Sequence, residues 1–267
     1  MDKICYNKNK MKWRDYKMKT IAFVNQKGGV GKTTTVINVG MGLQKLNKKI
    51  LLIDLDPQGN LTYSIGIPAH ELKVTVFDLL KEKASLSEVI IEKDNLDIVT
   101  ANLSLSGADM ELAGIAGREF LLKDILDKVS GYDYVLIDCP PNLGILTLNA
   151  LTAANAVYVP LQTEYLAMQG MSQLLQTVEV VKARLNKELK LEGIIGTMYD
   201  SRRNLCKEVV AKLKEHFGEI VFKTLIRDNV ALAEAPSFGK SIFDYKKESN
   251  GAKDYFNLCK EIIKRGE

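Results

Sequence analysis

A glycine-rich segment near the start of the chain constrains its fold more than any other feature. Residues 27–33 read KGGVGKT, follow a short apolar run at 20–25 and precede a helical pattern that extends to about Leu46. A strand, a glycine-rich loop and a helix in this order bind phosphate in α/β proteins, because backbone N–H groups converge at the helix N-terminus. The segment therefore predicts a nucleotide-binding α/β domain.

Each residue of this loop has an expected part in holding phosphate. The glycines let backbone N–H groups approach phosphate oxygens without a Cβ in the way, Lys32 reaches the β- and γ-phosphates, and the Thr33 hydroxyl is a ligand for Mg²⁺. Thr34 adds a donor near the α-phosphate. The usual pattern has glycine where this chain has Gln26, which lies beside Lys27. The expected nucleotide-binding residues are Lys27, Gly28, Gly29, Val30, Gly31, Lys32, Thr33 and Thr34.

Acidic residues follow two other predicted strands. Asp54 and Asp56 lie at the end of the run at 50–55, and Asp138 follows the run at 134–137. Ligands of open parallel sheets bind outside the carboxyl ends of the strands, so these carboxylates should lie beside the glycine-rich loop. One carboxylate there can hold a Mg²⁺-bound water, which we expect of Asp138, and another can orient an attacking water.

The alternation of apolar runs and helical patterns predicts the fold class. The expected strands are 20–25, 50–55, 96–99, 134–137, 156–161 and 194–197. The expected helices are 32–46, 118–129, 142–153, 165–185, 203–216 and 250–265. With no linker or repeat between them, these elements indicate an α/β single-domain P-loop fold, in which a mostly parallel twisted sheet has helices on both faces.

Composition argues against several other classes of protein. Of the 267 residues, 46% are hydrophobic and 26% are charged, which is ordinary for a folded domain. No apolar run approaches the roughly 20 residues of a membrane-spanning helix, residues 1–17 lack the apolar core of a signal peptide, and we expect a cytoplasmic protein. The four cysteines are far apart and there are two histidines, which argues against a disulfide framework, a zinc ribbon and His-based catalysis.

The net charge of +4 is unevenly distributed along the chain. Residues 1–17 hold six basic and two acidic residues and show no apolar periodicity. Because Met18 directly precedes the first strand, we interpret 1–17 as a disordered basic arm or a misread start and assign 18–267 to the folded domain. Residues 182–267 hold 18 basic and 13 acidic residues, an excess that weakly indicates a nucleic-acid partner.

The motifs at 27–33, 54–58 and 138–141 together resemble those of the deviant Walker ATPases, and specifically of the ParA/Soj partition proteins. The likeness covers about residues 20–265 and continues through 197–204, 229–239 and 249–252. It implies an ATPase of this family whose cofactors are ATP and Mg²⁺ and which is a homodimer when ATP is bound.

The resemblance also implies roles for individual residues. Lys27 is the family's signature lysine, which reaches the partner's phosphates when two ATP-loaded subunits meet. A second cation beside the transferring phosphoryl group would act as an arginine finger does. Asp56 orients the attacking water. The implied catalytic residues are Lys27, Lys32 and Asp56, and the implied magnesium site consists of Thr33, Asp54 and Asp138.

The implied function is that of an ATP-dependent dimerisation switch. The ATP form binds DNA without sequence preference and, with a ParB-like centromere-binding partner, drives partition of a chromosome or plasmid until slow hydrolysis resets it. We expect a cytoplasmic, nucleoid-associated protein with no membrane contact. Asp228 and Ala231 stand where many relatives have arginine, so the roles of those arginines are not carried over. The expected DNA contacts are Arg202, Arg203 and Arg227, with Lys207, Lys212, Lys214 and Lys240 as further candidates.

Two alternatives remain open from the sequence. A MinD-like positioning ATPase would use the amphipathic segment 250–265 as a membrane helix, although a helix docked on the core fits the same pattern. A metabolic P-loop kinase or ligase would transfer phosphate to a small molecule and would turn over only with that second substrate.

Overall fold

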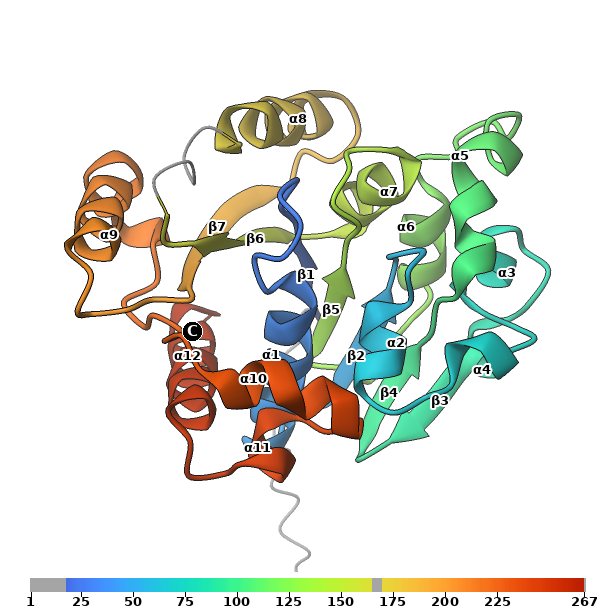
Figure 1. Ribbon diagram of the computed structural model, residues 1–267. Helices are drawn as coiled ribbons and strands as arrows, with labels where there is room; N and C mark the ends of the chain where they lie inside the picture. Colours follow the sequence, from blue (N-terminus) through green and yellow to red (C-terminus); the bar gives the residue numbers. More distant parts are fainter. Residues whose placement is uncertain (1–17, 165–169, 267) are drawn as a thin grey trace, which may run out of the picture.

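The computed structural model describes residues 18–164 and 170–266 and shows one seven-stranded sheet (Figure 1). In space the strands follow the order β3, β4, β2, β5, β1, β6 and β7. Their bounds are β1 Lys19–Phe23, β2 Ile50–Asp54, β3 Ile90–Lys93, β4 Leu96–Val99, β5 Tyr134–Asp138, β6 Ala156–Gln162 and β7 Lys190–Thr197. The expectations for residues 1–17 lie outside the described residues.

The sheet is parallel from β4 to β7, as the sequence predicts. The central strand β1 lies between β5 and β6, and β5 also pairs with β2. In this register Asp138 lies beside Phe23 on one side and beside Asp54 on the other. The residues that follow β1, β2 and β5 therefore emerge at the same edge of the sheet.

The strand β3 was missed by the sequence analysis and is antiparallel to β4. The two strands are joined by a two-residue turn in which Asp94 and Asn95 have φ angles of 52° and 58°. Positive φ at both central residues matches the twist of a hairpin, and Asn and Asp tolerate it better than most residues. The short run Ile90–Lys93 has no helix before β4, so the expected strand–helix alternation gave no signal for it.

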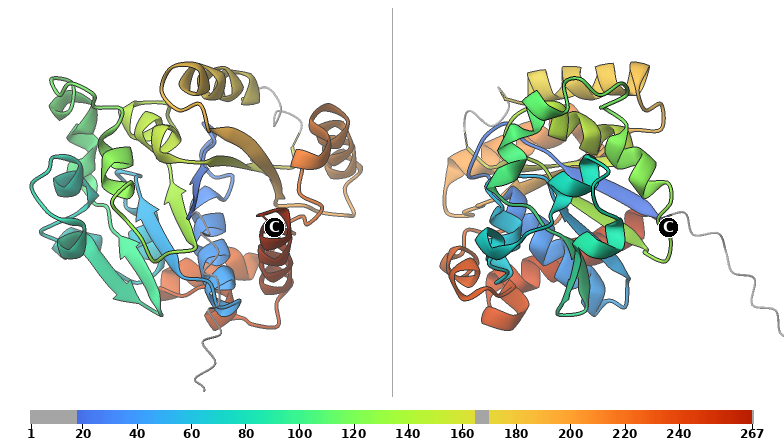
Figure 2. Two further views of the ribbon diagram at one scale, coloured as in Figure 1. Left: turned by 180° about the vertical axis from the view of Figure 1, so that it is seen from behind. Right: turned by 90° about the vertical axis from the view of Figure 1, so that its right-hand side faces the viewer.

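Helices cover both faces of the sheet, in two layers that are separated by the strands (Figure 2). One layer consists of α3 Val76–Leu80, α4 Leu86–Val89, η2 Leu103–Gly107, α5 Ala108–Glu111, α6 Leu121–Leu126, α7 Ile145–Ala153, α8 Met171–Arg184 and α9 Asn204–Phe217. The other consists of α1 Lys32–Lys45, α2 Asn60–Ser64, α10 Val230–Glu234, α11 Ile242–Tyr245 and α12 Asn250–Gly266. Short 3₁₀ turns complete the chain at η1 Ala69–Glu71, η4 Gly218–Ile220 and η5 Ala235–Phe238.

The C-terminal helix α12 packs along α1 with its apolar face in the core. Leu258, Cys259 and Ile262 are fully buried, and the Tyr255 hydroxyl lies 3.0 Å from that of Thr35. The apolar face of the segment 250–265 is thus covered by protein, which is the docked-helix arrangement. Within residues 18–164 and 170–266, no helix is long and apolar enough to cross a membrane.

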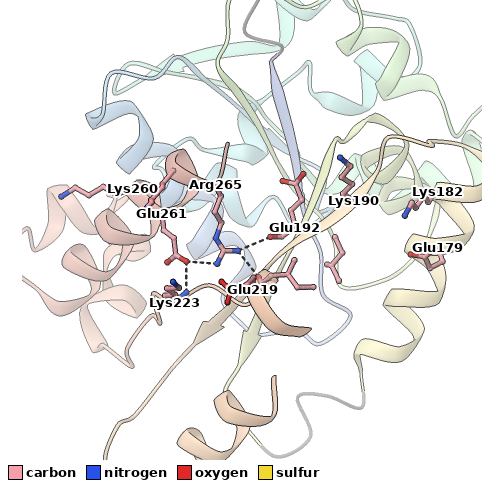
Figure 3. A pocket seen from close by; sticks show the side chains of 12 residues that line it. Glu179, Lys182, Lys190, Glu192, Glu219, Lys223, Lys260, Glu261 and Arg265 are labelled. Carbon is pink, nitrogen blue, oxygen red and sulfur yellow. Dashed lines mark hydrogen bonds and ion pairs between the residues drawn. The ribbon is translucent and has the colours of Figure 1, made fainter. Parts of the chain in front are cut away.

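A groove of about 960 Å³ runs along the amino-terminal half of β7 between α8 and α12 (Figure 3). At its centre Arg265 donates hydrogen bonds to the carbonyl oxygens of Glu192, Ile220 and Val221, and it pairs with Glu261. The guanidinium therefore satisfies one backbone acceptor of the edge strand β7, at Glu192, and two acceptors at the end of η4. Because β7 runs from this groove toward Thr197, the groove lies at the end of the sheet opposite to the glycine-rich loop.

Replacing Gly193 by alanine should lower the free energy of unfolding by about 1–3 kcal/mol through overpacking. The added Cβ would lie 2.5 Å from the Phe222 ring and 2.8 Å from the Tyr158 ring, and both rings are fully buried. Urea denaturation measures this change. Gly114→Ala, whose added Cβ meets nothing within 4 Å, is the control and should change stability by less than about 0.5 kcal/mol. Equal stability of the two variants would show that this layer repacks freely.

Candidate nucleotide-binding site

The glycine-rich loop leaves β1 and turns into the first residue of α1. Gly29 and Gly31 have φ angles of 74° and 85°, a conformation that costs other L-residues strain. Gly28 and Gly29 face open space where a side chain would stand. The backbone can thus approach a ligand closely at the N-terminus of a 14-residue helix, where unpaired N–H groups favour an anion.

Two polar side chains that the sequence analysis did not assign to the site fix the loop in place. Asn25 accepts a hydrogen bond from the Lys27 N–H at 3.0 Å and donates to the Pro160 carbonyl at 2.8 Å. The Thr197 hydroxyl donates to the Val30 carbonyl at 2.8 Å. Both side chains are buried, so β6 and β7 hold the two halves of the loop.

Thr33 and Asp138 meet directly, as expected for a shared magnesium site. The Thr33 hydroxyl donates to Asp138 Oδ2 at 2.6 Å, while Asp138 Oδ1 is buried and has no hydrogen-bond partner among the described residues. Burial, together with the nearby Asp54 carboxylate, raises the pKa of Asp138 well above its usual range. A hydroxyl beside a fully buried carboxylate that has one unmatched oxygen fits Mg²⁺, a cation that prefers oxygen ligands and retains water.

Lys32 lies beside these carboxylates and is 8% exposed. Burial lowers the pKa of its ammonium, whereas the negative charges of Asp138 and Asp56 oppose that shift. The side chain is therefore withdrawn from water within the carboxylate cluster. The role of Lys32 as a phosphate-binding cation stays a prediction.

Asp54 is surrounded by donors of its own chain. Its Oδ1 accepts from the Asp56 N–H at 3.1 Å, and its Oδ2 accepts from the Thr62 N–H at 3.0 Å and the Thr62 hydroxyl at 2.8 Å. Burial raises the pKa of Asp54 to about 7 although these hydrogen bonds act in the opposite direction. The structure thus gives Asp54 a clear part in shaping the segment that carries Asp56.

Asp56 is 7% exposed and stands at the start of this turn. Its Oδ1 accepts from the Gln58 N–H at 3.0 Å, and its other oxygen has no hydrogen-bond partner within the described residues. Asp56 therefore keeps one carboxylate oxygen available to a water molecule. The water-orienting role of Asp56 stays a prediction.

A pocket of about 140 Å³ lies next to the loop at Gly31 and Thr34. The remaining lining residues come from the end of β7, from the segment before and within α10, and from α12; they are Thr197, Met198, Ile226, Arg227, Asp228, Asn229, Leu232, Ala233 and Tyr255. Apolar walls with a few polar groups beside a phosphate loop suit the nucleoside part of a nucleotide.

Comparison with known proteins agrees with this geometry. Residues 18–191 match the AAA domain family. The chain is 49% identical to the chromosome-partitioning ATPase Soj of Treponema pallidum over 250 residues, which are 92% of this chain and 98% of that protein. It is 47% identical to the sporulation initiation inhibitor protein Soj of Bacillus subtilis over 251 residues, covering 93% and 99%. The chain belongs to the ParA/Soj family of ATPases.

The fold of this ParA/Soj chain also matches a solved structure. The crystal structure of cobyrinic acid a,c-diamide synthase from Mycobacterium smegmatis with bound ADP and magnesium has a TM-score of 0.83 and 38% identity, covering 93% of this chain and 95% of that one. The family, the single-domain P-loop fold and the class of enzyme predicted from the sequence, an ATPase, are thereby confirmed.

Lys27, which the sequence predicts to be the signature lysine, makes the polar contacts of its side chain at the end of β6. Its ammonium donates to Gln162 Oε1 and to Glu164 Oε2, each at 3.1 Å, and its side chain is 47% exposed. Gln162 in turn donates to Glu164 Oε1 at 2.7 Å. Gln162, the last residue of β6, and Glu164, two residues beyond it, thus hold the lysine at the surface.

The predicted DNA-contacting arginines fall into two environments. Arg202 and Arg203 are exposed before and at the start of α9, and both pair with Asp200, whose pKa they lower to about 2. Arg227 instead makes a bidentate contact with buried Asp254, with Nη2 to Oδ1 at 2.6 Å. The structure therefore presents the first two guanidinium groups at the surface, whereas the third is engaged with α12.

Replacing Thr62 by valine should lower the free energy of unfolding by about 1–3 kcal/mol, because a buried N–H loses its acceptor. The Thr62 hydroxyl accepts from the Ala101 N–H at 3.0 Å while it donates to Asp54, and it is fully buried. Urea denaturation without nucleotide measures the loss. Thr62→Ser keeps the hydroxyl and should retain more of the stability; a valine variant as stable as the serine variant would refute the importance of this hydrogen bond.

Proposed function

We propose that this protein is an ATP-dependent dimerisation switch that binds DNA without sequence preference and partitions a chromosome or plasmid with a ParB-like partner. ATP and Mg²⁺ are its cofactors. Two ATP-loaded subunits associate, the dimer binds DNA, and slow hydrolysis returns the subunits to the monomer. The folded domain is 18–267, and the protein acts in the cytoplasm in association with the nucleoid.

The observation that carries this proposal is the opposite placement of two lysines on one loop. Lys32 is buried beside Asp138, whereas Lys27 is half-exposed on the outer side of the same loop. One cation serves the nucleotide of its own chain, and the other is accessible to a second subunit. A cation supplied across an interface stabilises charge on a transferring phosphoryl group as an arginine finger does.

Different residues of the loop and its neighbours bind the phosphates, the nucleoside and the magnesium ion. Backbone N–H groups of residues 28–34 bind phosphate oxygens, Lys32 neutralises them, and the pocket lined by Asn229 and Tyr255 takes the nucleoside. The Thr33 hydroxyl and Asp138 hold Mg²⁺, with Asp54 behind them. An ion held there would supply positive charge against the negative charge that develops on the phosphates during transfer.

Hydrolysis needs a water positioned in line with the bond to the leaving ADP. Asp56 supplies the orienting oxygen, since one of its carboxylate oxygens is held by Gln58 and the other is available. The water attacks the γ-phosphorus, the bond from this phosphorus to the β–γ bridging oxygen breaks, and the products are ADP and phosphate. Separation of the two subunits follows because the contact of Lys27 across the interface loses its γ-phosphate.

DNA binding is assigned to the surface that carries Arg202 and Arg203. Phosphate contacts of this kind give affinity without base recognition. Arg227 is the weaker candidate because its guanidinium is held by buried Asp254 and its side chain is 42% exposed, against 88% for Arg202 and 69% for Arg203. Exposed lysines on and near α9 extend the same basic surface; they are Lys207, Lys212 and Lys214.

A metabolic ligase is the second candidate, and the name of the similar Mycobacterium smegmatis protein favours it. The partition proteins are nevertheless more similar, at 47–49% identity against 38%. A ligase hydrolyses ATP productively only with its small-molecule substrate. The partition switch should hydrolyse ATP slowly alone and faster with DNA and the partner protein. The MinD-like alternative has less support, because α12 buries its apolar face against α1.

Asp56→Ala should bind ATP and dimerise but hydrolyse ATP at least tenfold more slowly, because the water loses its orientation while the phosphate contacts remain. Size-exclusion chromatography with ATP and Mg²⁺, combined with phosphate release, measures both properties. Lys32→Ala is the contrasting variant and should fail to bind ATP and remain monomeric. If Asp56→Ala hydrolysed ATP at the parental rate, the assigned role would be wrong.

Replacing both Arg202 and Arg203 by alanine should weaken binding to all duplexes alike and reduce the slope of log affinity against log salt by up to about 2 per subunit. ATP-dependent dimerisation should persist. The measurement is a salt titration of the ATP-bound dimer on two unrelated duplexes. Lys73→Ala with Lys128→Ala removes the same charge beside η1 and α6 and is the control. An unchanged slope in the arginine variant would exclude these residues as DNA contacts.

A further inference from the structure

The contact of Lys27 with the end of β6 has no part in the proposed reaction. The ammonium lies 3.1 Å from both Gln162 Oε1 and Glu164 Oε2, and Gln162 donates to the other oxygen of Glu164 at 2.7 Å. Gln162 therefore fixes the carboxylate and contributes an acceptor, while Glu164 contributes the charge. All three side chains belong to one subunit, so the lysine is neutralised within its own chain.

We propose that Glu164 is a positioning residue that holds Lys27 in a resting place, from which the lysine must be released before it can reach the nucleotide of a second subunit. This inference rests on the proposed function. One ammonium cannot remain bound to Glu164 of its own chain and at the same time move to phosphates across an interface. Dimerisation therefore exchanges a carboxylate for phosphate oxygens as the partner of Lys27.

The surroundings allow this exchange to occur by side-chain motion alone. The backbone of Lys27 is anchored through Asn25 to the Pro160 carbonyl, and Thr197 anchors the loop again at Val30. The four-carbon stem of Lys27 has room to reorient, because 47% of its side chain is exposed. The loop can thus keep its phosphate-binding shape in both states while the ammonium changes partners.

The ion pair between Lys27 and Glu164, called the latch below, is weak enough to raise the concentration needed for dimerisation without preventing dimerisation. Both side chains are about half-exposed, at 47% and 49%, and ion pairs of this kind are weak because water screens them. Loss of such a pair shifts an equilibrium by up to about fivefold. Glu164 should therefore raise the protein concentration at which ATP-loaded subunits pair, and salt should reduce this effect.

The test compares the parent with Glu164→Gln in ATP and Mg²⁺. Gln keeps the size of Glu164 and one acceptor oxygen but removes the charge that retains Lys27. The concentration for half-maximal dimerisation, measured by analytical ultracentrifugation, should fall at low salt by up to about 25-fold, since each of the two subunits contributes up to about fivefold, and the difference should shrink at high salt. Asp127→Asn is the matched control, because it removes one carboxylate from another surface pair, with Lys123, and should leave the curve unchanged.

A second pair of variants separates the latch from a simple change of charge near the nucleotide. ATP affinity is measured for Lys27→Ala and for Lys27→Ala with Glu164→Gln, at concentrations where both are monomers. Equal affinities, together with the shift in dimerisation, support the latch. A higher affinity in the double variant would overturn it, because the carboxylate would then act on the nucleotide without Lys27.

The remaining outcomes are decisive in different ways. If the parent dimerises with ATP but Glu164→Gln follows the parental curve or needs more protein, the inference is wrong and the proposed function stands. If the parent does not dimerise with ATP at any concentration, the proposed function itself fails. As a folding control, Glu164→Gln should unfold thermally at the same temperature as the parent. A change in the dimerisation curve then reflects association and not loss of stability.

Discussion

The hydrogen bond between Thr33 and Asp138 is the contact on which the site depends, because it joins the start of α1, directly after the glycine-rich loop, to the end of β5. The parallel pairing of β1, β5 and β2 makes it possible: Phe23, Asp138 and Asp54 lie in register at the same edge of the sheet. A slip of one residue would turn Asp138 to the other face. The fully buried strands on both sides prevent that slip, so hydrophobic packing sets the position of the polar groups.

This packing also creates the unusual electrostatics of the site. Asp54 and Asp138 are fully buried, and burial raises the pKa of both carboxyl groups, while burial lowers the pKa of Lys32. Buried charged groups of this kind lack hydration, so ligands of opposite charge that replace the lost water contacts should bind them strongly. An ion and a phosphate chain that bind only the folded protein would therefore also stabilise it. The same dry environment strengthens each interaction with phosphate.

The sequence was informative wherever several residues share one physical requirement. The loop at 27–33 and the aspartates after β2 and β5 could be predicted because chain order, strand ends and ligand chemistry all limit the choice. Single polar residues with no such pattern were missed. Nothing in the sequence around Asn25 or Thr62 distinguishes them from ordinary polar residues of a turn or helix. Only the folded structure shows that Asn25 anchors the loop and that Thr62 donates to Asp54. The hairpin strand β3 was missed for a similar reason, since it departs from the strand–helix alternation.

The end of β7 connects the two surfaces that the proposed switch requires. Thr197 donates to the Val30 carbonyl in the phosphate loop, and three residues later Asp200 pairs with Arg202 and Arg203. Between them Met198 has a φ of 51°, a conformation that a non-glycine residue keeps only where its surroundings impose it. The next residue, Tyr199, pairs with Arg227 in an isolated parallel bridge. The nucleotide loop and the exposed arginines are therefore joined by the short segment 197–200, in which Thr197, Tyr199 and Asp200 each make a defined contact. The distance between loop and arginines is thus set by backbone geometry and not by a flexible linker.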